Sequence, residues 1–376
     1  MMLRKNKSRA SWAEPLKRGR EQLRSELRSL ALGEALPPIR VLQEQTGLGR
    51  VRLERILGEF EQRGLIERRP RSGIYKIGSD PLEPSVSMIE LVICDSFSDI
   101  YTSHWFSAVV AKTLAEEAGR LGFGLRFQQF PFQAPVSDYE EFAAKCEVKN
   151  AIIYRAHMPD MARIFESYGI ATVSIYPRIV QRQATNVLLA DEQVVSQQLN
   201  HLWSLGHTCI GYFDPVKPDP YILETSHLIR REAYYRRMAE HGYRVEPHWV
   251  RYANGEPTNI FRAMESLFAR TPRPTAVIVG DNQLTSVYRF LEGRGFRIGK
   301  DVSVMGTDDL PDAVQVHPFA TTVRNPRLVI AQRAFEILQG RSRGEDVPDQ
   351  IVVEPELVVR ESTGPVEKKT KEKEEL

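Results

Sequence analysis

Hydrophobic and polar positions divide the chain into a short helical segment and a longer one in which apolar runs alternate with amphipathic helices. Within residues 12–31, leucines recur at helical spacing among charged residues, which predicts an amphipathic helix. Pro37 and Pro38 interrupt that pattern and open a second, short helix over 38–46, with proline in its first turn. Gly47 is expected to end this second helix.

A third helix is predicted in the segment GRVRLERILGEFEQRG, residues 49–64. Its apolar face repeats at helical spacing and consists of Leu53, Ile56, Leu57 and Phe60. The pieces LIERR and IYKIG flank the turn PRSG and predict a hairpin. Three helices followed by a basic hairpin are the order of a winged helix-turn-helix, in which the third helix enters the major groove of DNA.

Candidate DNA contacts lie on the other faces of that third helix and on the hairpin. On the helix they are Val51, Arg52 and Arg55. On the hairpin they are Arg68, Arg69 and Arg71, which would lie beside backbone phosphates or in a minor groove. The alternative is a small three-helix core whose arginines are merely solvated.

Residues 79–88, GSDPLEPSVS, lack periodicity and are interpreted as a linker. Beyond them, strands are predicted at 89–95, 124–130, 150–155, 171–176, 186–190, 209–213, 276–280, 302–306 and 351–359. Long helices are predicted between them, among others at 104–121, 192–205, 226–241 and 326–339. This alternation predicts an α/β fold of two doubly wound, Rossmann-like subdomains, with a ligand cleft at the carboxyl ends of the strands.

The expected organisation is therefore a DNA-binding domain over 1–78, the linker over 79–88 and an effector-binding and dimerisation domain over 89–363. The last residues, 364–376, are almost wholly charged, and we expect them to be disordered.

Charge supports this division. Residues 1–79 contain 18 Lys and Arg against 9 Asp and Glu, a net charge of +9, so the remainder carries −7 of the total of +2. A basic segment on an acidic body is typical of a nucleic-acid-binding module joined to a regulatory or enzymatic body.

The three cysteines stand far apart, which disfavours disulfides and metal sites and fits a reducing cytosol. There is no apolar run of about 18 residues and no signal-peptide pattern, so we expect a cytoplasmic protein without a membrane segment.

Motifs for catalysis are absent from the sequence. It contains no GxxxxGK[ST], GxSxG, HExxH or SxxK. The pairs Asp281-Asn282 and Asp308-Asp309 could act as acid/base groups, but no nucleophile or metal-ligand set accompanies them in the sequence. We expect neither catalysis nor a cofactor. A sugar-modifying enzyme and a plain cytoplasmic ligand-binding protein remain the alternatives.

Two family resemblances follow from the motifs. Residues 36–75, which include LPPIRVL, a glycine turn, an arginine-bearing helix and GLIERRPRSG, resemble the GntR-type winged helix-turn-helix. Residues 89–363 resemble the effector domain of LacI/GalR repressors, which shares its fold with periplasmic sugar-binding proteins. The motifs that carry this second resemblance lie at 191–213, 230–243, 276–309, 319–326 and 356–363. Together they resemble arabinose-repressor-type regulators.

The first resemblance implies DNA contacts by Arg40, Arg50, Arg52 and the wing from Arg69 to Gly73. The sequence departs from the family pattern in two places. Glu54-Arg55 stands where the family has Arg-Glu, and Gly49 stands in place of a small hydroxyl residue. These departures leave the operator sequence open.

The second resemblance implies a ligand-gripping arginine at Arg231 and a hydroxyl-binding pair at Asp281 and Asp308. In the arginine's motif, Tyr234 replaces a glycine. Both aspartates have capping of a following helix as an alternative role.

Other candidates come from the same resemblance. Asp191 would either bind the ligand or cap its helix. Trp105 or Phe106 would either stack on a sugar ring or pack in the core.

The resemblance thus implies a nucleoid-associated, homodimeric transcription regulator that binds double-stranded operator DNA. Its effector would be a small molecule, a sugar by preference, since carboxylates accept hydroxyl hydrogens and arginine donates two parallel hydrogen bonds. Relatives also accept purines in this cleft. The direction of the ligand's effect on DNA binding stays open.

Overall fold

The computed structural model describes residues 19–20, 22–27, 30–62, 64–70, 72–78, 87–94, 105–131, 134–182, 184–214, 225–253 and 256–366. The chain divides into two compact units, Met1–Val86 and Ser87–Leu376. Each is described by itself.

The N-terminal unit is helical with one hairpin. Residues 19–20 and 22–27 are helical and precede α2 (Ile39–Thr46) and α3 (Arg50–Gln62). The strands β1 (Ile66–Arg69) and β2 (Gly73–Lys76) pair antiparallel. The predicted apolar face of the third helix is confirmed, since Leu53, Ile56, Leu57 and Phe60 are all buried.

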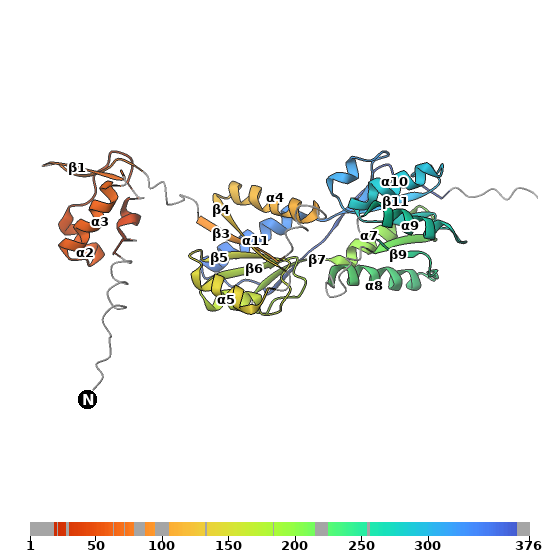
Figure 1. The fold of residues 1–376 in the computed structure, drawn as a ribbon, viewed down its shortest axis with the longest axis horizontal. Coiled ribbons are helices and arrows are strands. Elements are labelled where there is room, and N and C mark those ends of the chain that lie inside the picture. The colour runs from red at the N-terminus through yellow and green to blue at the C-terminus, as the bar shows by residue number, and fades with distance from the viewer. Residues whose placement is uncertain are drawn as a thin grey trace, which may run out of the picture. The chain divides into compact units, whose positions relative to one another are not determined.

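The first sheet of the larger unit is parallel. Among the described residues its order is β13-β7-β6-β5-β3-β4. The strands are β3 (Ser87–Cys94), β4 (Phe123–Phe130), β5 (Asn150–Tyr154), β6 (Ala171–Ile175), β7 (Thr185–Leu189) and β13 (Gln350–Val353). Helices α4 (Trp105–Arg120) and α11 (Arg327–Ser342) pack on one face, and α5 (Val136–Lys145) and α6 (Met161–Ser167) on the other (Figure 1).

The second sheet has the described order β14-β12-β11-β10-β8-β9 and is parallel except for β14. Its strands are β8 (Ile210–Asp214), β9 (Val250–Tyr252), β10 (Ala276–Ile278), β11 (Ser303–Asp308), β12 (Thr321–Arg324) and β14 (Glu356–Val358). Helix α7 (Asp191–Ser204) packs on α8 (Thr225–Glu240), and α9 (Pro257–Phe268) packs on α10 (Leu284–Gly293). The short 3-10 helices η2 (Asp281–Gln283) and η3 (Pro311–Val314) follow β10 and β11.

The chain passes between the two sheets three times. It leaves the first sheet after β7 and returns after β12 through α11, and β13 is then followed by β14 of the second sheet. The predicted pair of Rossmann-like subdomains is therefore confirmed.

One strand prediction was wrong, and two strands of the structure were not predicted. Residues 351–359 are not one strand: β13 and β14 belong to different sheets, because Pro355 between them lacks a backbone N–H donor and breaks the ladder. Strands β9 and β12 were not predicted, since they are only three and four residues long. Such short runs lack a periodic signal.

Candidate functional site

A cluster of two carboxylates and one guanidinium lies at the carboxyl ends of strands in the larger unit. Asp191 follows β7 as the first residue of α7, and Asp308 ends β11. Arg230 of α8 lies between them: its Nε donates to Oδ1 of Asp191 at 2.7 Å, and its Nη2 lies 3.7 Å from Oδ1 of Asp308. Burial alone would lower the pKa of Arg230, but the two aspartate charges outweigh it and raise that pKa.

The arginine in this cluster is Arg230, not the predicted Arg231. Arg230 and Tyr234 are four residues apart and share the helix face that packs on β8, where the Tyr234 hydroxyl donates to the carbonyl of Ile210 at 2.7 Å. Arg231 donates through Nη1 to Oδ2 of Asp214, the last residue of β8, at 2.7 Å, and its contact with a ligand stays a prediction. Tyr234, which stands where the resemblance predicts a glycine, is thus a fully buried core residue of this helix.

Asp191 and Asp308 do not act as helix caps, the alternative weighed for both. Neither α7 nor η3 has a side-chain cap bond, and their N-cap positions are Ala190 and Leu310. Both carboxylates are partly exposed, at 15% and 23%. They are therefore placed to accept hydrogen bonds from a ligand as well as from Arg230.

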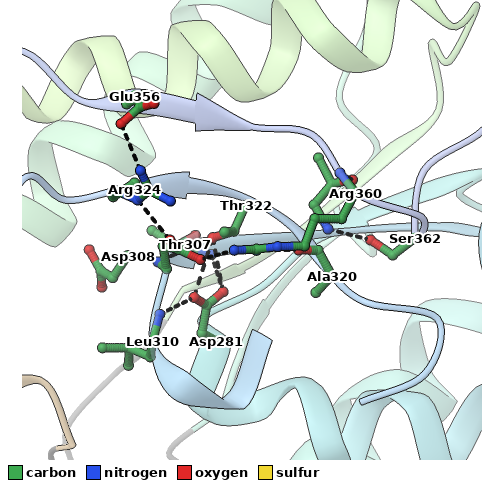
Figure 2. A network of polar contacts seen from close by, with 12 residues as sticks. Asp281, Thr307, Asp308, Leu310, Ala320, Thr322, Arg324, Glu356, Arg360 and Ser362 are labelled. Carbon is green, nitrogen blue, oxygen red and sulfur yellow. Dashed lines mark hydrogen bonds and ion pairs between the residues drawn. The ribbon is translucent and has the colours of Figure 1, made fainter. Parts of the chain in front are cut away.

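Asp281 lies deeper than Asp308. It is 1% exposed, and its Oδ1 and Oδ2 accept hydrogen bonds from the backbone N–H groups of Thr307 and Leu310, each at 2.7 Å (Figure 2). The Thr322 hydroxyl lies 3.1 Å from Oδ1. Burial raises the pKa of Asp281 well above its usual range, and the charge of Asp308 adds to this. Ligand contact by Asp281 stays a prediction, and the geometry gives this side chain internal partners instead.

Two aromatic rings, those of Phe106 and Tyr176, lie beyond the carboxyl end of β6 in the first sheet. Phe106 is half-buried and packs edge-on against Tyr176 with ring centroids 5.3 Å apart. The Tyr176 hydroxyl donates to Oδ1 of Asn325 at 2.6 Å, so it bridges β6 and the segment after β12. Burial raises the pKa of Tyr176, and the charges of Asp308 and Asp191 act on it as well. Trp105 begins α4, and its side chain lies outside the described residues.

Tyr176, Asn325 and Arg230 were not singled out from the sequence, although a signal for each was present. Tyr176 ends a predicted strand, Asn325 lies in the motif FATTVRNP, and Arg230 opens the motif RREAYY. Ligands of doubly wound sheets bind beyond carboxyl strand ends, which points to the first two.

The N-terminal unit presents several predicted DNA contacts to solvent. Val51 is 84% exposed although apolar, and the side chains of Arg40 and Arg55 are 91% and 75% exposed. Arg50 and Arg52 are exposed on the first turn of α3. Gly47, with φ of +66°, ends α2 and allows the sharp turn into α3.

The hairpin arginines differ from one another. Arg68 forms ion pairs with two glutamates of α3, at 2.6 Å from Glu54 and 3.1 Å from Glu61, so it ties the hairpin to the helix. Arg69 lies over the Tyr75 ring at 4.4 Å and is half-exposed. Gly73 has φ of +131°, a conformation that favours glycine. Arg71 lies outside the described residues.

Among the described residues, no group of three or more His, Cys, Asp or Glu side chains is arranged to hold a metal ion. None of the described helices combines the length and apolar character needed to cross a membrane.

Comparison with known proteins identifies a domain family and a relative with similar sequences. Residues 199–363 match the periplasmic binding protein-like domain family. The HTH-type transcriptional repressor PurR of Escherichia fergusonii is 31% identical over 164 residues, which are 43% of this chain and 47% of the relative. The matched part therefore spans about half the length of that relative. Because this relative is a repressor, it agrees with the prediction that the chain is not an enzyme.

Solved structures extend the likeness. The complex of the transcriptional regulator CelR with cellobiose has a TM-score of 0.60 at 20% identity, over 86% of this chain and 94% of that one. A LacI family transcriptional regulator from Enterococcus faecium with bound ribose has a TM-score of 0.60 at 17% identity, over 74% of this chain and 100% of that one. This chain therefore has the fold of LacI-type transcriptional regulators over most of its length, with sequence similarity to the periplasmic binding protein-like domain.

Proposed function

We propose that this protein is a DNA-binding transcriptional regulator whose operator affinity is controlled by a sugar. The observation that carries the proposal is the Asp191–Arg230–Asp308 cluster, which lies where the two sheets' carboxyl ends supply polar groups. Ligand binding there would change the relative stability of two arrangements of the subdomains, which is what allosteric control requires.

The chemistry of the cluster favours a hydroxyl-rich, uncharged ligand. Two carboxylates surround the Arg230 guanidinium, and the guanidinium of Arg327 donates to the backbone carbonyl of Asp308 at 2.6 Å, so the charges are balanced and the cluster is rich in acceptors. Sugar hydroxyls donate to such carboxylates, and the Phe106 and Tyr176 rings offer an apolar face for a pyranose. The CelR and Enterococcus faecium structures contain cellobiose and ribose, which fits this class. A purine is the second candidate effector.

The N-terminal unit would act as a GntR-type winged helix-turn-helix. In this proposal α3 enters the major groove with Arg50, Val51, Arg52 and Arg55, while Arg40 and the β1–β2 hairpin contact phosphates. Support comes from the charge of +9 on residues 1–79 and from the exposure of these side chains. The regulator would act in the cytoplasm, on the nucleoid, as a homodimer, because paired half-sites increase specificity.

Selection of bound fragments from a genomic DNA pool by the purified protein at about 150 mM salt tests DNA binding, since non-specific contacts weaken there. We expect a palindromic site to be recovered. An Arg50→Ala, Arg52→Ala double variant serves as control and should recover none. Absence of enrichment by the unaltered protein, with and without sugars, would overturn the proposal.

The ligand class is tested by thermal unfolding with ribose, cellobiose and adenine, each at several concentrations. A sugar that binds only the folded state raises Tm, and the rise grows with the logarithm of the ratio of sugar concentration to Kd. We expect a rise with at least one sugar and none after Asp308→Asn. A rise with adenine alone would replace the sugar by a purine.

A further inference from the structure

The turn that carries Asp308 has a strained backbone. Asp308 and Asp309 both have positive φ, +88° and +51°, although neither is glycine. Non-glycine residues adopt this left-handed region only where the surrounding structure compels them to. Some neighbouring group must therefore hold residues 307–310 in place.

Asp281 is that group on one side of the turn. Its carboxylate receives the N–H of Thr307, just before the strained pair, and the N–H of Leu310, just after it. A single carboxylate thus closes both ends of the turn. The Thr322 hydroxyl, 3.1 Å from Oδ1 and 3.3 Å from Oδ2, adds a link to the neighbouring strand β12.

On the other side of the turn, Asp309 forms ion pairs with two arginines of neighbouring segments. Its Oδ2 accepts from Nε of Arg324 at 2.8 Å, and its Oδ1 accepts from Nη2 of Arg360 at 2.7 Å. Arg324 also reaches Glu356 at 2.9 Å, and Arg360 donates to the carbonyl of Ala320 at 2.8 Å (Figure 2). Both ion pairs lower the pKa of Asp309 although burial acts in the other direction.

Between these two attachments, the Asp308 side chain points away from Asp281 (Figure 2) and lies near Arg230. The close fit extends to Gly306, where an added Cβ would lie 2.1 Å from Oδ1 of Asp281. The positions of residues 306–310 therefore depend on the Asp281 carboxylate and on Arg327, whose Nη1 and Nη2 donate to the backbone carbonyls of Asp308 and Asp309 at 2.6 Å and 3.1 Å.

We infer that Asp281 is a positioning residue, which orients Asp308 toward Arg230 and the ligand without touching the ligand itself. This inference rests on the proposed function for the role of Asp308 and replaces the direct contact expected for Asp281. The geometry supports it because Asp281 is buried and both of its oxygens already accept backbone hydrogen bonds. Specificity would thus depend on a residue outside the ligand's contact surface.

Hydrogen exchange of the unliganded full-length protein tests the positioning role directly. In Asp281→Asn, one oxygen becomes an amide that cannot accept, so the N–H of Thr307 or Leu310 loses its partner. We expect its exchange to rise about tenfold or more, the equivalent of one charge-assisted hydrogen bond. Unchanged exchange at both amides in a folded variant would overturn the inference.

Asp301→Asn is the matched control. Asp301 also accepts a backbone N–H, from Arg297 at 2.7 Å, but lies at the surface outside the turn. This variant should accelerate exchange at Arg297 and leave Thr307 and Leu310 unchanged. If Asp281→Asn does not fold, Thr322→Val removes the hydroxyl contact with Asp281 and a weak acceptor of the Asp309 N–H at 3.4 Å. A smaller acceleration at Thr307 and Leu310 is then expected, and no acceleration at either amide would overturn the inference.

A second readout separates positioning from direct contact. With whichever sugar raises the Tm of the unaltered protein, affinity is compared among Asp281→Asn, Asp308→Asn and the double variant. Positioning predicts that the double variant binds as Asp308→Asn does, whereas direct contact predicts a further loss and would overturn the inference. If no sugar binds, the proposed effector class fails, while the exchange result still decides the role of Asp281.

Discussion

Arginines in the two units occupy opposite environments. In the N-terminal unit the Arg40 and Arg55 side chains are 91% and 75% exposed, and each forms a long ion pair of 3.5 Å, with Glu44 and Glu59 respectively. In the larger unit the Arg230 side chain is 11% exposed and lies between two carboxylates. Arginine is therefore solvated in the first unit and buried between carboxylates in the second.

The difference shows what each arginine is free to bind. An exposed guanidinium in a long, solvated ion pair can exchange that partner for a phosphate or a base edge at little cost, and binding DNA releases counterions. A buried guanidinium must have anionic partners because an unpaired buried charge is costly. Exposure thus fits the DNA recognition proposed for the first unit, and burial between two carboxylates fits the preorganised ligand site proposed for the second.

The largest expected effect follows from Arg230→Ala. It leaves Asp191 and Asp308 close together without their shared cation, so the free energy of unfolding should fall by about 3–5 kcal/mol. Urea unfolding measures the change. Arg236→Ala, which removes a half-exposed ion pair with Glu192, is the control and should cost under about 1 kcal/mol. Equal losses in the two variants would contradict the contrast between buried and exposed arginines.

A smaller effect is expected on DNA. Arg50→Ala should weaken operator binding by about 1–3 kcal/mol if it reads a base, while the stability of the protein changes by less than about 0.5 kcal/mol. Fluorescence anisotropy at several salt concentrations measures the affinity. Arg68→Ala provides the comparison: because Arg68 is paired with Glu54 and Glu61, its loss should affect stability more than DNA affinity. The reverse order would assign Arg68 to the DNA interface.

The smallest effect concerns acid stability. The pKa of Asp309 is lowered in the fold, so its ion pairs stabilise the protein above the unfolded pKa of about 3.9. That contribution is lost as the pH falls through the folded pKa. Asp309→Asn should therefore lower stability by about 1 kcal/mol at pH 7 and remove part of the loss seen below pH of about 4. Unfolding curves at pH 7 and pH 3 measure both; an unchanged pH dependence would show that the pairs contribute nothing.

Much of the fold could be predicted from the chain alone. Helix α3 and its buried face followed from apolar spacing, and α8 begins within one residue of its predicted start. The position of Arg230 was missed because neighbouring residues on a helix differ by about 100° in direction. The packing of Tyr234 on β8 determines which of the two arginines faces Asp191 and Asp308 and which faces Asp214.

Asp281 shows a second limit. From the sequence it and Asp308 were equivalent, since each follows a buried strand. The structure separates them, because the turn after β11 directs two backbone N–H groups at Asp281 and leaves Asp308 partly exposed. Contacts between residues more than 25 positions apart, such as those of Asp281 with Thr307 and Leu310, produce no periodic pattern in the sequence.

Local pattern by itself determined the order of elements, the basic and acidic division of the chain and the strand ends where polar residues gather. These properties depend on interactions within a few residues, which spacing records directly. The tertiary structure alone decided that β13 and β14 separate into different sheets, that Arg230 rather than Arg231 joins Asp191 and Asp308, and that Asp281 is enclosed. The physical reason is that the burial and pairing of charges depend on neighbours that are distant in the sequence. These neighbours come together only when the chain folds into two sheets and passes between them.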